Sequence, residues 1–467
     1  MLSLPTLNTN VTEPGTLPPL AVYLETYGCQ MNVYDSELVQ SILSSCGFET
    51  ATSVEAADVV LMNTCAIREN AHRKIYGRLD LLRPLGRART RAGRPFVVGI
   101  LGCMAQNLKD ELFDHPMVDL IAGPDNYKSL PTLIRGAITS GEPRIEAHLS
   151  EYETYADVAP IRAAGVNAWI AVMRGCDNFC TFCVVPYTRG RERCRSVASI
   201  VDETHALVEN GYPQVTLLGQ NVNSYRHEGA EFADLIRAVA EVPGIQRVRF
   251  TSPHPKDFPL SLLSAIAAHP NICKHVHLPV QAGSDRILDK MNRTYTRREY
   301  LALVDLVRQT IPNVAITTDV IIGFPTETEA DFQETADLVR EAAFDNAFVF
   351  KYSEREGTVA RRDFPDDVPP AAKTDRIVRL LDLQHAISKK KNEARVGQIL
   401  DVLIEGMGEK RDDHQFGKSD GYQTVTFPAT GQPTGSLVPV RILRATQGGL
   451  HGVGVGESSL GPRVASE

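Results

Sequence analysis

Short apolar runs alternate with longer amphipathic stretches between Leu20 and about Arg135. The runs cover residues 21–26, 59–63, 96–101 and, more weakly, 118–122. This alternation predicts strands of a parallel α/β sheet that are connected by helices. We therefore expect a first domain over residues 20–137. The preceding segment, 1–19, is rich in Pro, Thr and Asn, which is typical of a disordered tail.

The alternation returns after a predicted linker over residues 138–161. It repeats about six times, with strands near Ala171, Val215, Val248, Val276, Ile316 and Phe348. Six repeats predict a partial (β/α)6 barrel over residues 162–393, with one side open to admit a large substrate. A long helix over 371–394 is expected at the end of this barrel. In such barrels, functional residues gather at the C-terminal ends of the strands.

The pattern changes after Gly397. Short β-rich runs at 399–404 and 438–443 are separated by Gly and Asp turns, which predicts a small β-barrel over residues 395–459. Small barrels of the OB type commonly bind RNA, whereas a structural cap is the alternative. The expected fold class is thus α/β, with a parallel-sheet domain, a partial barrel and a small C-terminal β-barrel.

Three cysteines in the second domain have an unusual spacing. Cys176, Cys180 and Cys183 form a Cys-x3-Cys-x2-Cys pattern. Three thiolates can hold three irons of a 4Fe-4S cube and leave the fourth iron open. A structural zinc site is the alternative, but zinc usually takes four ligands, and no fourth partner lies nearby in the sequence.

This pattern resembles that of the radical S-adenosylmethionine (SAM) enzymes, and Phe182 before the third cysteine also fits them. The resemblance implies that the open iron chelates SAM, which is cleaved to a 5'-deoxyadenosyl radical. Polar clusters follow the predicted barrel strands, among them Lys351-Tyr352-Ser353. From these clusters we expect Gln220, Gln281 and Ser284 to hold the polar parts of SAM, while turns are the alternative explanation.

A second set of three cysteines lies in the first domain. Cys29, Cys65 and Cys103 each follow one of the first three predicted strands. The carboxyl ends of parallel strands meet at one edge of a sheet, so these thiols should converge and form a second three-cysteine site. Three small buried hydrophobic residues are the alternative. Cys46, Cys194 and Cys273, predicted in a helix, an Arg-rich turn and a loop, have no other cysteine at cluster spacing.

Composition is that of an ordinary globular protein, with 43% hydrophobic and 23% charged residues in a chain of 467. Nine dispersed cysteines favour reduced thiols and metal ligation over disulfides. No apolar stretch approaches the roughly 20 residues that a membrane span needs. The N-terminal segment lacks the pattern of a signal peptide, so we expect a cytoplasmic protein without a membrane partner.

The formal net charge of −8 does not favour a nucleic-acid partner, but local charge matters more than the sum. Positive charge concentrates in three stretches, each of which could instead be a solvated surface. They are Arg73, Lys74, Arg78, Arg83, Arg87, Arg89, Arg91 and Arg94; Arg189, Arg191, Arg193 and Arg195; and Lys389, Lys390, Lys391 and Arg395.

Six motifs together resemble the methylthiotransferases over nearly the whole chain. They are Tyr27-Gly28-Cys29-Gln30-Met31-Asn32 with Tyr34-Asp35-Ser36-Glu37; Asn63-Thr64-Cys65; Gly102-Cys103-Met104-Ala105-Gln106; Val185-Pro186-Tyr187-Thr188-Arg189-Gly190-Arg191; Leu218-Gly219-Gln220-Asn221-Val222-Asn223-Ser224-Tyr225; and His277-Leu278-Pro279-Val280-Gln281. The order of domains is similar to theirs, with a C-terminal TRAM domain. Cys194 departs from the family, which usually has serine there.

The match is closest to the branch of this family that converts N6-dimethylallyladenosine, next to the anticodon of tRNA, into its 2-methylthio derivative. The resemblance implies two 4Fe-4S clusters. One SAM methylates a sulfur on the auxiliary cluster of Cys29, Cys65 and Cys103, and a second SAM supplies the radical. It also implies tRNA as partner, an electron-donor protein such as a flavodoxin, and a monomer.

Two other hypotheses remain. The first is a methylthiotransferase that acts on an aspartate of a ribosomal protein, although that branch has Pro-Lys-Asn where this chain has Gln30-Met31-Asn32. The second is a non-catalytic iron-sulfur protein that binds RNA or senses redox state. Binding of tRNA by the C-terminal barrel and cleavage of SAM would separate them from the tRNA enzyme.

Overall fold

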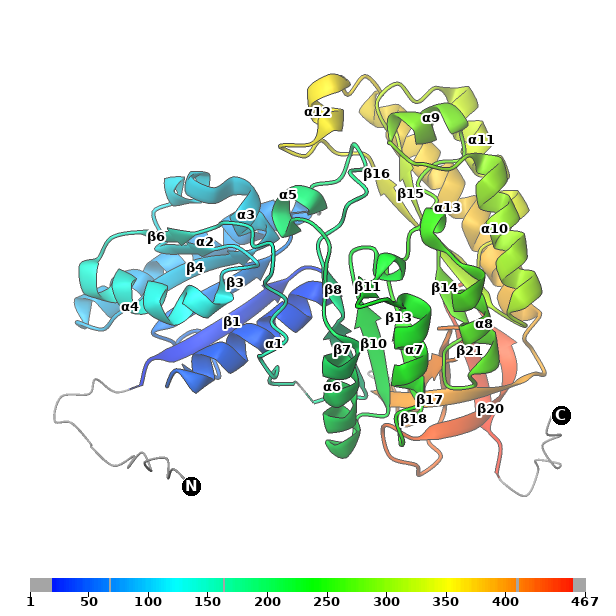
Figure 1. The fold of residues 1–467 in the computed structure, drawn as a ribbon, viewed down its shortest axis with the longest axis horizontal. Helices are drawn as coiled ribbons and strands as arrows, with labels where there is room; N and C mark the ends of the chain where they lie inside the picture. Colours follow the sequence, from blue (N-terminus) through cyan, green and yellow to red (C-terminus); the bar gives the residue numbers. More distant parts are fainter. Residues whose placement is uncertain (1–18, 67–68, 163, 409–410, 457–467) are drawn as a thin grey trace.

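The N-terminal domain is a six-stranded parallel sheet with strand order β2-β1-β3-β4-β5-β6 (Figure 1). The computed structural model describes residues 19–66, 69–162, 164–408 and 411–456. The strands of this sheet are β1 (Ala21–Tyr27), β2 (Glu49–Thr50), β3 (Val59–Thr64), β4 (Val97–Gly102), β5 (Leu120–Ala122) and β6 (Arg144–Glu146). The predicted tail, 1–19, lies almost wholly outside the described residues.

Both faces of this sheet are covered, which explains its continuous apolar strands. Val59 and Leu61 pack into one core with the helices α1 and α4, while Val60 and Met62 pack into a second core with α2. The helices are α1 (Gln30–Ser45), α2 (Glu69–Arg91), α3 (Cys103–Leu108) and α4 (Leu130–Ser140). The predicted linker, 138–161, begins too early, because 144–146 forms the edge strand β6 beside β5.

The second domain contains six parallel strands in two three-stranded sheets, ordered β13-β10-β7 and β14-β15-β16. A parallel bridge joins Val248 of β13 to Ile272, in the segment that leads into β14 of the second sheet. The strands are β7 (Asn167–Ala171), β10 (Gln214–Leu218), β13 (Arg247–Phe250), β14 (His275–His277), β15 (Ala315–Ile322) and β16 (Asn346–Lys351). This arrangement confirms the predicted partial barrel.

Helices cover the outside of this barrel and share one apolar core with its strands. They are α6 (Val197–Glu209), α7 (Phe232–Ala240), α8 (Leu260–Ala268), α9 (Asp285–Lys290), α10 (Arg297–Thr310), α11 (Glu329–Ala342), α12 (Val359–Asp363) and α13 (Pro370–Glu393). The short helix α5 (Val185–Arg189) instead packs on α3 of the N-terminal domain. Two small antiparallel pairs also occur, β8 (Met173–Arg174) with β9 (Arg193–Cys194) and β11 (Arg226–His227) with β12 (Ala230–Glu231). Short 3-10 helices lie at Lys109–Asp114 and Tyr127–Ser129 in the N-terminal domain and at Val222–Ser224 and Pro255–Asp257 in the barrel domain.

The C-terminal domain is a closed five-stranded barrel, which confirms the predicted small β-barrel. Its strands are β17 (Ile399–Gly408), β18 (Arg411–Ser419), β19 (Thr424–Pro428), β20 (Leu437–Ala445) and β21 (Leu450–Gly454). Buried Arg247 and Arg249 of β13 donate to backbone carbonyls of this barrel, including Lys418 and Ser419 at 2.6 and 2.7 Å. The small barrel thus covers the amino-terminal end of β13, away from α5 and α12 (Figure 1).

No helix within the described ranges is both long and apolar enough to cross a bilayer.

Candidate active site

Strand register brings the N-terminal cysteines to one edge of the sheet. Tyr27 of β1 pairs with Thr64 of β3, and Thr64 pairs with Gly102 of β4. Cys65 and Cys103 each come one residue after these aligned strand ends, and Cys29 comes two residues after. The three thiols therefore lie at the carboxyl edge where open parallel sheets bind ligands.

Asn32 links the ends of two of these strands, β1 and β3. Its Oδ1 accepts from the Cys29 thiol at 3.3 Å, and its Nδ2 donates to Asn63 Oδ1 at 3.0 Å and to the Thr64 carbonyl at 3.2 Å. Gly102 has a φ of +84°, and an added Cβ would lie 2.4 Å from Asn63 Oδ1. Only glycine fits at this position, which explains why glycine precedes Cys103.

A buried ion network from the second domain reaches this edge. Asp35 accepts from Arg174 Nη2 at 2.5 Å through Oδ1 and from Arg189 Nη2 at 2.8 Å through Oδ2. Arg189 also donates from Nε to the Cys103 sulfur at 3.2 Å. Burial raises the pKa of Cys103 and the nearby Cys29 adds to this effect, while the Arg189 guanidinium opposes it.

The second cysteine triad lies on the loop between β8 and α5. Gly175 has a φ of +83°, and a Cβ there would lie 2.0 Å from the Arg191 carbonyl oxygen. Only glycine therefore allows the backbone at 175 to pack this closely against the backbone at 191. The Cys176 amide donates to the Gly190 carbonyl at 3.1 Å, and the Cys183 amide donates to the Cys180 carbonyl at 3.0 Å. These bonds fold the loop so that its cysteines share one environment.

The thiols of this loop interact electrostatically. Burial, then the nearby Cys180 and Glu192, raise the pKa of Cys176 to about 11. Desolvation of its sulfur, then Cys180 and Cys176, raise the pKa of Cys183 to about 12. Arg293 donates from Nη1 to the Cys180 sulfur at 3.3 Å. A buried group of thiols with a cationic donor suits an anionic iron-sulfur cluster better than neutral thiols.

Both triads fit a 4Fe-4S cluster in donor type and number. Each offers three sulfur ligands, and each has an arginine that donates to one of them. Over the described part of the chain, no three His, Cys, Asp or Glu side chains converge on a single-ion site. A cluster places each thiolate on a different iron, so its ligands need not converge on one point.

The two triads adjoin each other. Val184, next to Cys183, is buried against Cys103 and Ala66, and α5 packs on α3 (Figure 1). A cavity of about 680 Å³ opens beside them. Its lining residues are Ala66, His72, Asn107, Leu108, Lys351, Tyr352, Ser353, Glu354, Arg355, Glu356, Arg361, Asp366, Pro370 and Lys373.

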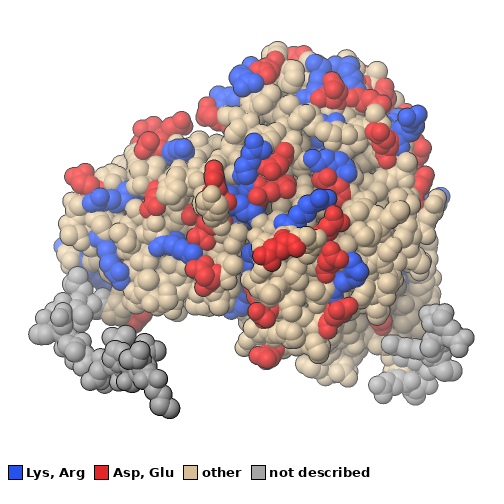
Figure 2. All heavy atoms as spheres, viewed as in Figure 1, with Lys and Arg blue, Asp and Glu red and all other residues tan. Residues whose placement is uncertain are grey.

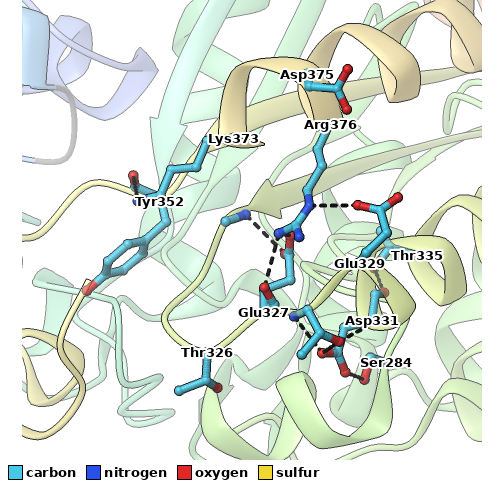
Figure 3. Close-up of polar contacts among 12 residues, drawn as sticks. Ser284, Thr326, Glu327, Glu329, Asp331, Thr335, Tyr352, Lys373, Asp375 and Arg376 are labelled. Carbon is cyan, nitrogen blue, oxygen red and sulfur yellow. Dashed lines mark hydrogen bonds and ion pairs between the residues drawn. The ribbon is translucent and has the colours of Figure 1, made fainter. Parts of the chain in front are cut away.

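This cavity includes the predicted polar cluster after β16. Tyr352 is 6% exposed, and within the described ranges its hydroxyl has no hydrogen-bond partner. Lys373 donates to Asp366 Oδ1 at 2.5 Å and lies 5.3 Å from the centre of the Tyr352 ring (Figure 3). The cavity therefore combines an aromatic ring, a buried hydroxyl and several cations.

The residues predicted to hold SAM have different surroundings. Gln220 accepts from the Gly175 amide at 2.6 Å, so it supports the second cysteine loop. Gln281 has a φ of +74° and its backbone bridges to Val320 of β15. Phe182 packs on the core of the barrel. Ser284 is buried and turned toward Asp331, to which it donates at 2.7 Å (Figure 3). Contact of these four with SAM stays a prediction.

Sequence reasoning missed the roles of Asp35, Arg174 and Arg293. Asp35 lies within a quoted motif, but its partner Arg189 is 154 residues away in the chain. No local sequence pattern predicts such a pair, because only the packing of the two domains brings its residues together.

The expectation that the stretch 189–195 presents its charge on the surface is wrong for three of its four arginines. Arg189, Arg193 and Arg195 are 3%, 7% and 5% exposed and pair with carboxylates. Only Arg191 is exposed. The Arg-rich pattern therefore builds a domain interface. Cys194, predicted in a turn, lies in the short strand β9.

The other two basic stretches are also partly paired. Arg78 pairs with Glu25, Arg89 and Arg94 pair with Asp58, and Lys391 and Arg395 pair with Asp345. On the face drawn in Figure 2, positive and negative side chains are interspersed. Only the exposed cations that do not pair with carboxylates are therefore candidates for contacts with a nucleic acid.

The remaining cysteines give a direct test of this assignment. We expect C46S, C194S and C273S each to retain full iron after anaerobic reconstitution, because none lies at either triad. Iron and acid-labile sulfide analysis measures this. If any one of these variants lost about four irons, that cysteine would be a cluster ligand and the assignment would be wrong.

Comparison with known proteins agrees with this architecture. Family models match as the radical SAM superfamily over residues 170–339, the uncharacterized protein family UPF0004 over 21–123 and the TRAM domain over 393–455. Among solved structures, the radical SAM methyltransferase TsrM from Kitasatospora setae, with cobalamin and a [4Fe-4S] cluster bound, has a TM-score of 0.53 at 15% identity and covers 73% of this chain and 74% of that one. That likeness shows the fold.

Curated relatives are much more similar. A tRNA-2-methylthio-N(6)-dimethylallyladenosine synthase from Porphyromonas gingivalis is 46% identical over 92% of this chain and 94% of its own. The protein of the same name from Chloroherpeton thalassium is 47% identical over 92% of this chain and 95% of its own. With such identity along all three domains, this chain belongs to the tRNA-2-methylthio-N(6)-dimethylallyladenosine synthase family of radical SAM enzymes.

Proposed function

We propose that this protein is a radical SAM methylthiotransferase that converts N6-dimethylallyladenosine beside the anticodon of tRNA into 2-methylthio-N6-dimethylallyladenosine. One observation carries the proposal. Two three-cysteine sites from different domains adjoin each other, and a cavity opens at Ala66, which packs with Cys103 and Val184 where the two sites meet. A single iron-sulfur site would suffice for generating a radical, whereas two sites allow a radical and a sulfur source to serve one substrate.

Each triad has a distinct part in this proposal. Cys176, Cys180 and Cys183 would hold the cluster at which SAM is cleaved, and Cys29, Cys65 and Cys103 would hold the auxiliary cluster. With three protein ligands each, both clusters would keep one iron free of protein ligands; the first cluster would supply reductive cleavage of SAM, and the auxiliary cluster would supply the sulfur. Arg293 and Arg189 donate to Cys180 and Cys103 and so hold one ligand of each cluster.

The cavity supports a nucleotide as the substrate. Its wall carries the buried Tyr352 and the cations Lys351 and Arg355, together with Arg361 and Lys373, which pair with the wall residues Glu356 and Asp366. An aromatic side chain can stack on a base, and cations can contact phosphates beside a base that is turned out of its stack. The segment that carries Arg361 is fixed to the second cysteine loop, because the Ala360 amide donates to the Thr181 carbonyl at 2.8 Å.

The direct experiment is anaerobic incubation of the reconstituted protein with SAM, a reductant and prenylated tRNA, followed by nucleoside mass spectrometry. The 2-methylthio derivative is the expected product. Unprenylated tRNA serves as the matched control substrate. An aspartate-containing ribosomal-protein peptide, tested in parallel, should remain unmodified. Modification of the peptide in place of the tRNA would make the protein-directed activity the correct one.

We also propose that the C-terminal barrel contacts the tRNA backbone. Arg441 and Arg444 of β20 are exposed, and in the described part of the chain neither has an ion-pair partner. Truncation before the barrel is a poor test, because it would uncover Arg247 and Arg249, which the barrel buries. Charge reversal at the surface avoids this problem.

We expect R441E/R444E to weaken tRNA binding. The slope of log K against the logarithm of the salt concentration should also become less steep by about 1.5, because two phosphate contacts are lost. Filter binding at several salt concentrations measures both effects. The control is R237E/R340E, which reverses two surface arginines on α7 and α11 that pair with Asp234 and Asp337. Equal binding by R441E/R444E and the unaltered protein would exclude this surface.

We propose further that the protein acts in the cytoplasm as a monomer and receives its electrons from a carrier such as a flavodoxin. A carrier is needed because reductive cleavage of SAM consumes one electron, which amino-acid side chains do not supply.

A further inference from the structure

Arg189 belongs to the barrel domain but reaches into the N-terminal domain. It ends α5, six residues after Cys183, yet its guanidinium lies within the carboxyl edge of the N-terminal sheet. It is 3% exposed, and its Nε donates to the Cys103 sulfur at 3.2 Å while its Nη2 donates to Asp35 at 2.8 Å. One side chain of the barrel domain thus contacts a proposed ligand of the other domain's cluster.

The surroundings hold this guanidinium firmly. Asp35 is fully buried, and its carboxylate also accepts from Arg174 and from the Tyr127 hydroxyl. Within the described ranges, Nη1 of Arg189 is buried and has no hydrogen-bond partner. Burying a charged group with an unused donor is costly, so the site favours an additional anionic group next to this arginine. An iron-sulfur cluster on Cys103 would be such a group.

We infer that Arg189 is a positioning residue for the N-terminal cluster, and that its hydrogen bond to the Cys103 sulfur makes the reduction potential of this cluster depend on docking of the two domains. Donors to cluster sulfurs and nearby positive charge stabilise the reduced, more negative state, and so raise the potential. This inference rests on the proposed function, since it assumes that Cys29, Cys65 and Cys103 hold a cluster.

The test uses the full-length C176A/C180A/C183A protein, in which only the N-terminal cluster remains. R189Q and R189K are introduced into it, and the midpoint potential is measured by EPR-monitored redox titration. R189Q should shift the midpoint to a more negative value, because both the donor and the charge are lost. R189K keeps the charge and should give an intermediate midpoint.

The matched control is R195Q in the same background. Arg195 is similarly buried and also reaches the N-terminal domain, donating to the Tyr34 hydroxyl at 3.3 Å, but within the described ranges it donates to no cysteine. A change of potential confined to Arg189 supports the inference. Loss of iron from R189Q but not from R195Q supports it too, because the arginine would then be needed to hold the cluster.

Other outcomes overturn it. If R189Q had the iron content and midpoint of its parent, or if R195Q shifted the midpoint equally, Arg189 would have only a structural role. If the parent itself bound no iron, the proposed auxiliary cluster would be wrong, and this inference would fall with it.

Discussion

Replacing Cys176, Cys180 and Cys183 with alanine is expected to abolish 5'-deoxyadenosine formation, while about four irons remain in the protein. Replacing Cys29, Cys65 and Cys103 should also leave about four irons, but this protein should still cleave SAM on reduction and should make no methylthio product. The asymmetry follows because the radical arises at one triad and sulfur comes from the other.

Iron analysis, SAM-cleavage assays and nucleoside mass spectrometry measure the three quantities. The matched control is the triple variant C46S/C194S/C273S, which removes the same number of thiols without touching either triad. It should behave like the unaltered protein in all three measurements. Methylthioadenosine formed in tRNA by the N-terminal triple variant would disprove the two-cluster assignment.

Substitution of Asp35 is expected to be the most destabilising single change at the domain interface. D35A would leave the buried Arg174 and Arg189 without their shared carboxylate. Breaking a buried ion pair by removing one partner typically costs about 3–5 kcal/mol. The urea midpoint for unfolding of the N-terminal domain should fall accordingly.

The matched control is D234A, since Asp234 pairs with Arg237 on an exposed helix surface at 50% and 43% side-chain exposure. Such a pair contributes about 0–1 kcal/mol. If D35A and D234A shifted the midpoint equally, the interface network would not contribute to stability as the contacts indicate.

The same carboxylate has a pH dependence of defined sign. Burial raises the pKa of Asp35, but Arg174 and Arg189 outweigh this and leave its pKa below the usual value. A group with a lowered folded pKa stabilises the protein above its unfolded pKa of about 3.9, and this contribution is lost as pH falls through the folded value. The stability difference between D35A and the unaltered protein should therefore shrink below pH 3.9.

Local patterns were sufficient for most of the strands and for locating both cysteine triads in the chain. The apolar runs of the first domain predicted β1, β3 and β4 to within about one residue of their ends, because buried parallel strands are apolar on both faces. The weaker run at 118–122 left β5 less well defined, and β6 was missed because its three residues are partly exposed and carry no apolar run.

The convergence of Cys29, Cys65 and Cys103 at one edge also followed from sequence. Each cysteine comes one or two residues after a strand, and parallel strands in register must end together. The spacing of the second triad is local in the same sense, since all three cysteines lie on one loop. Neither inference required knowledge of how the domains are arranged.

Only the tertiary structure decided what the charged residues do. In sequence, Arg189, Arg193 and Arg195 look like a basic surface, yet they are buried between domains, with carboxylates such as Asp35 and Asp125 as partners. Charge along a chain does not reveal burial, because a distant partner can neutralise each cation. The contact of Arg189 with Cys103, and the cavity beside both triads, likewise exist only because two separately folded domains pack against each other.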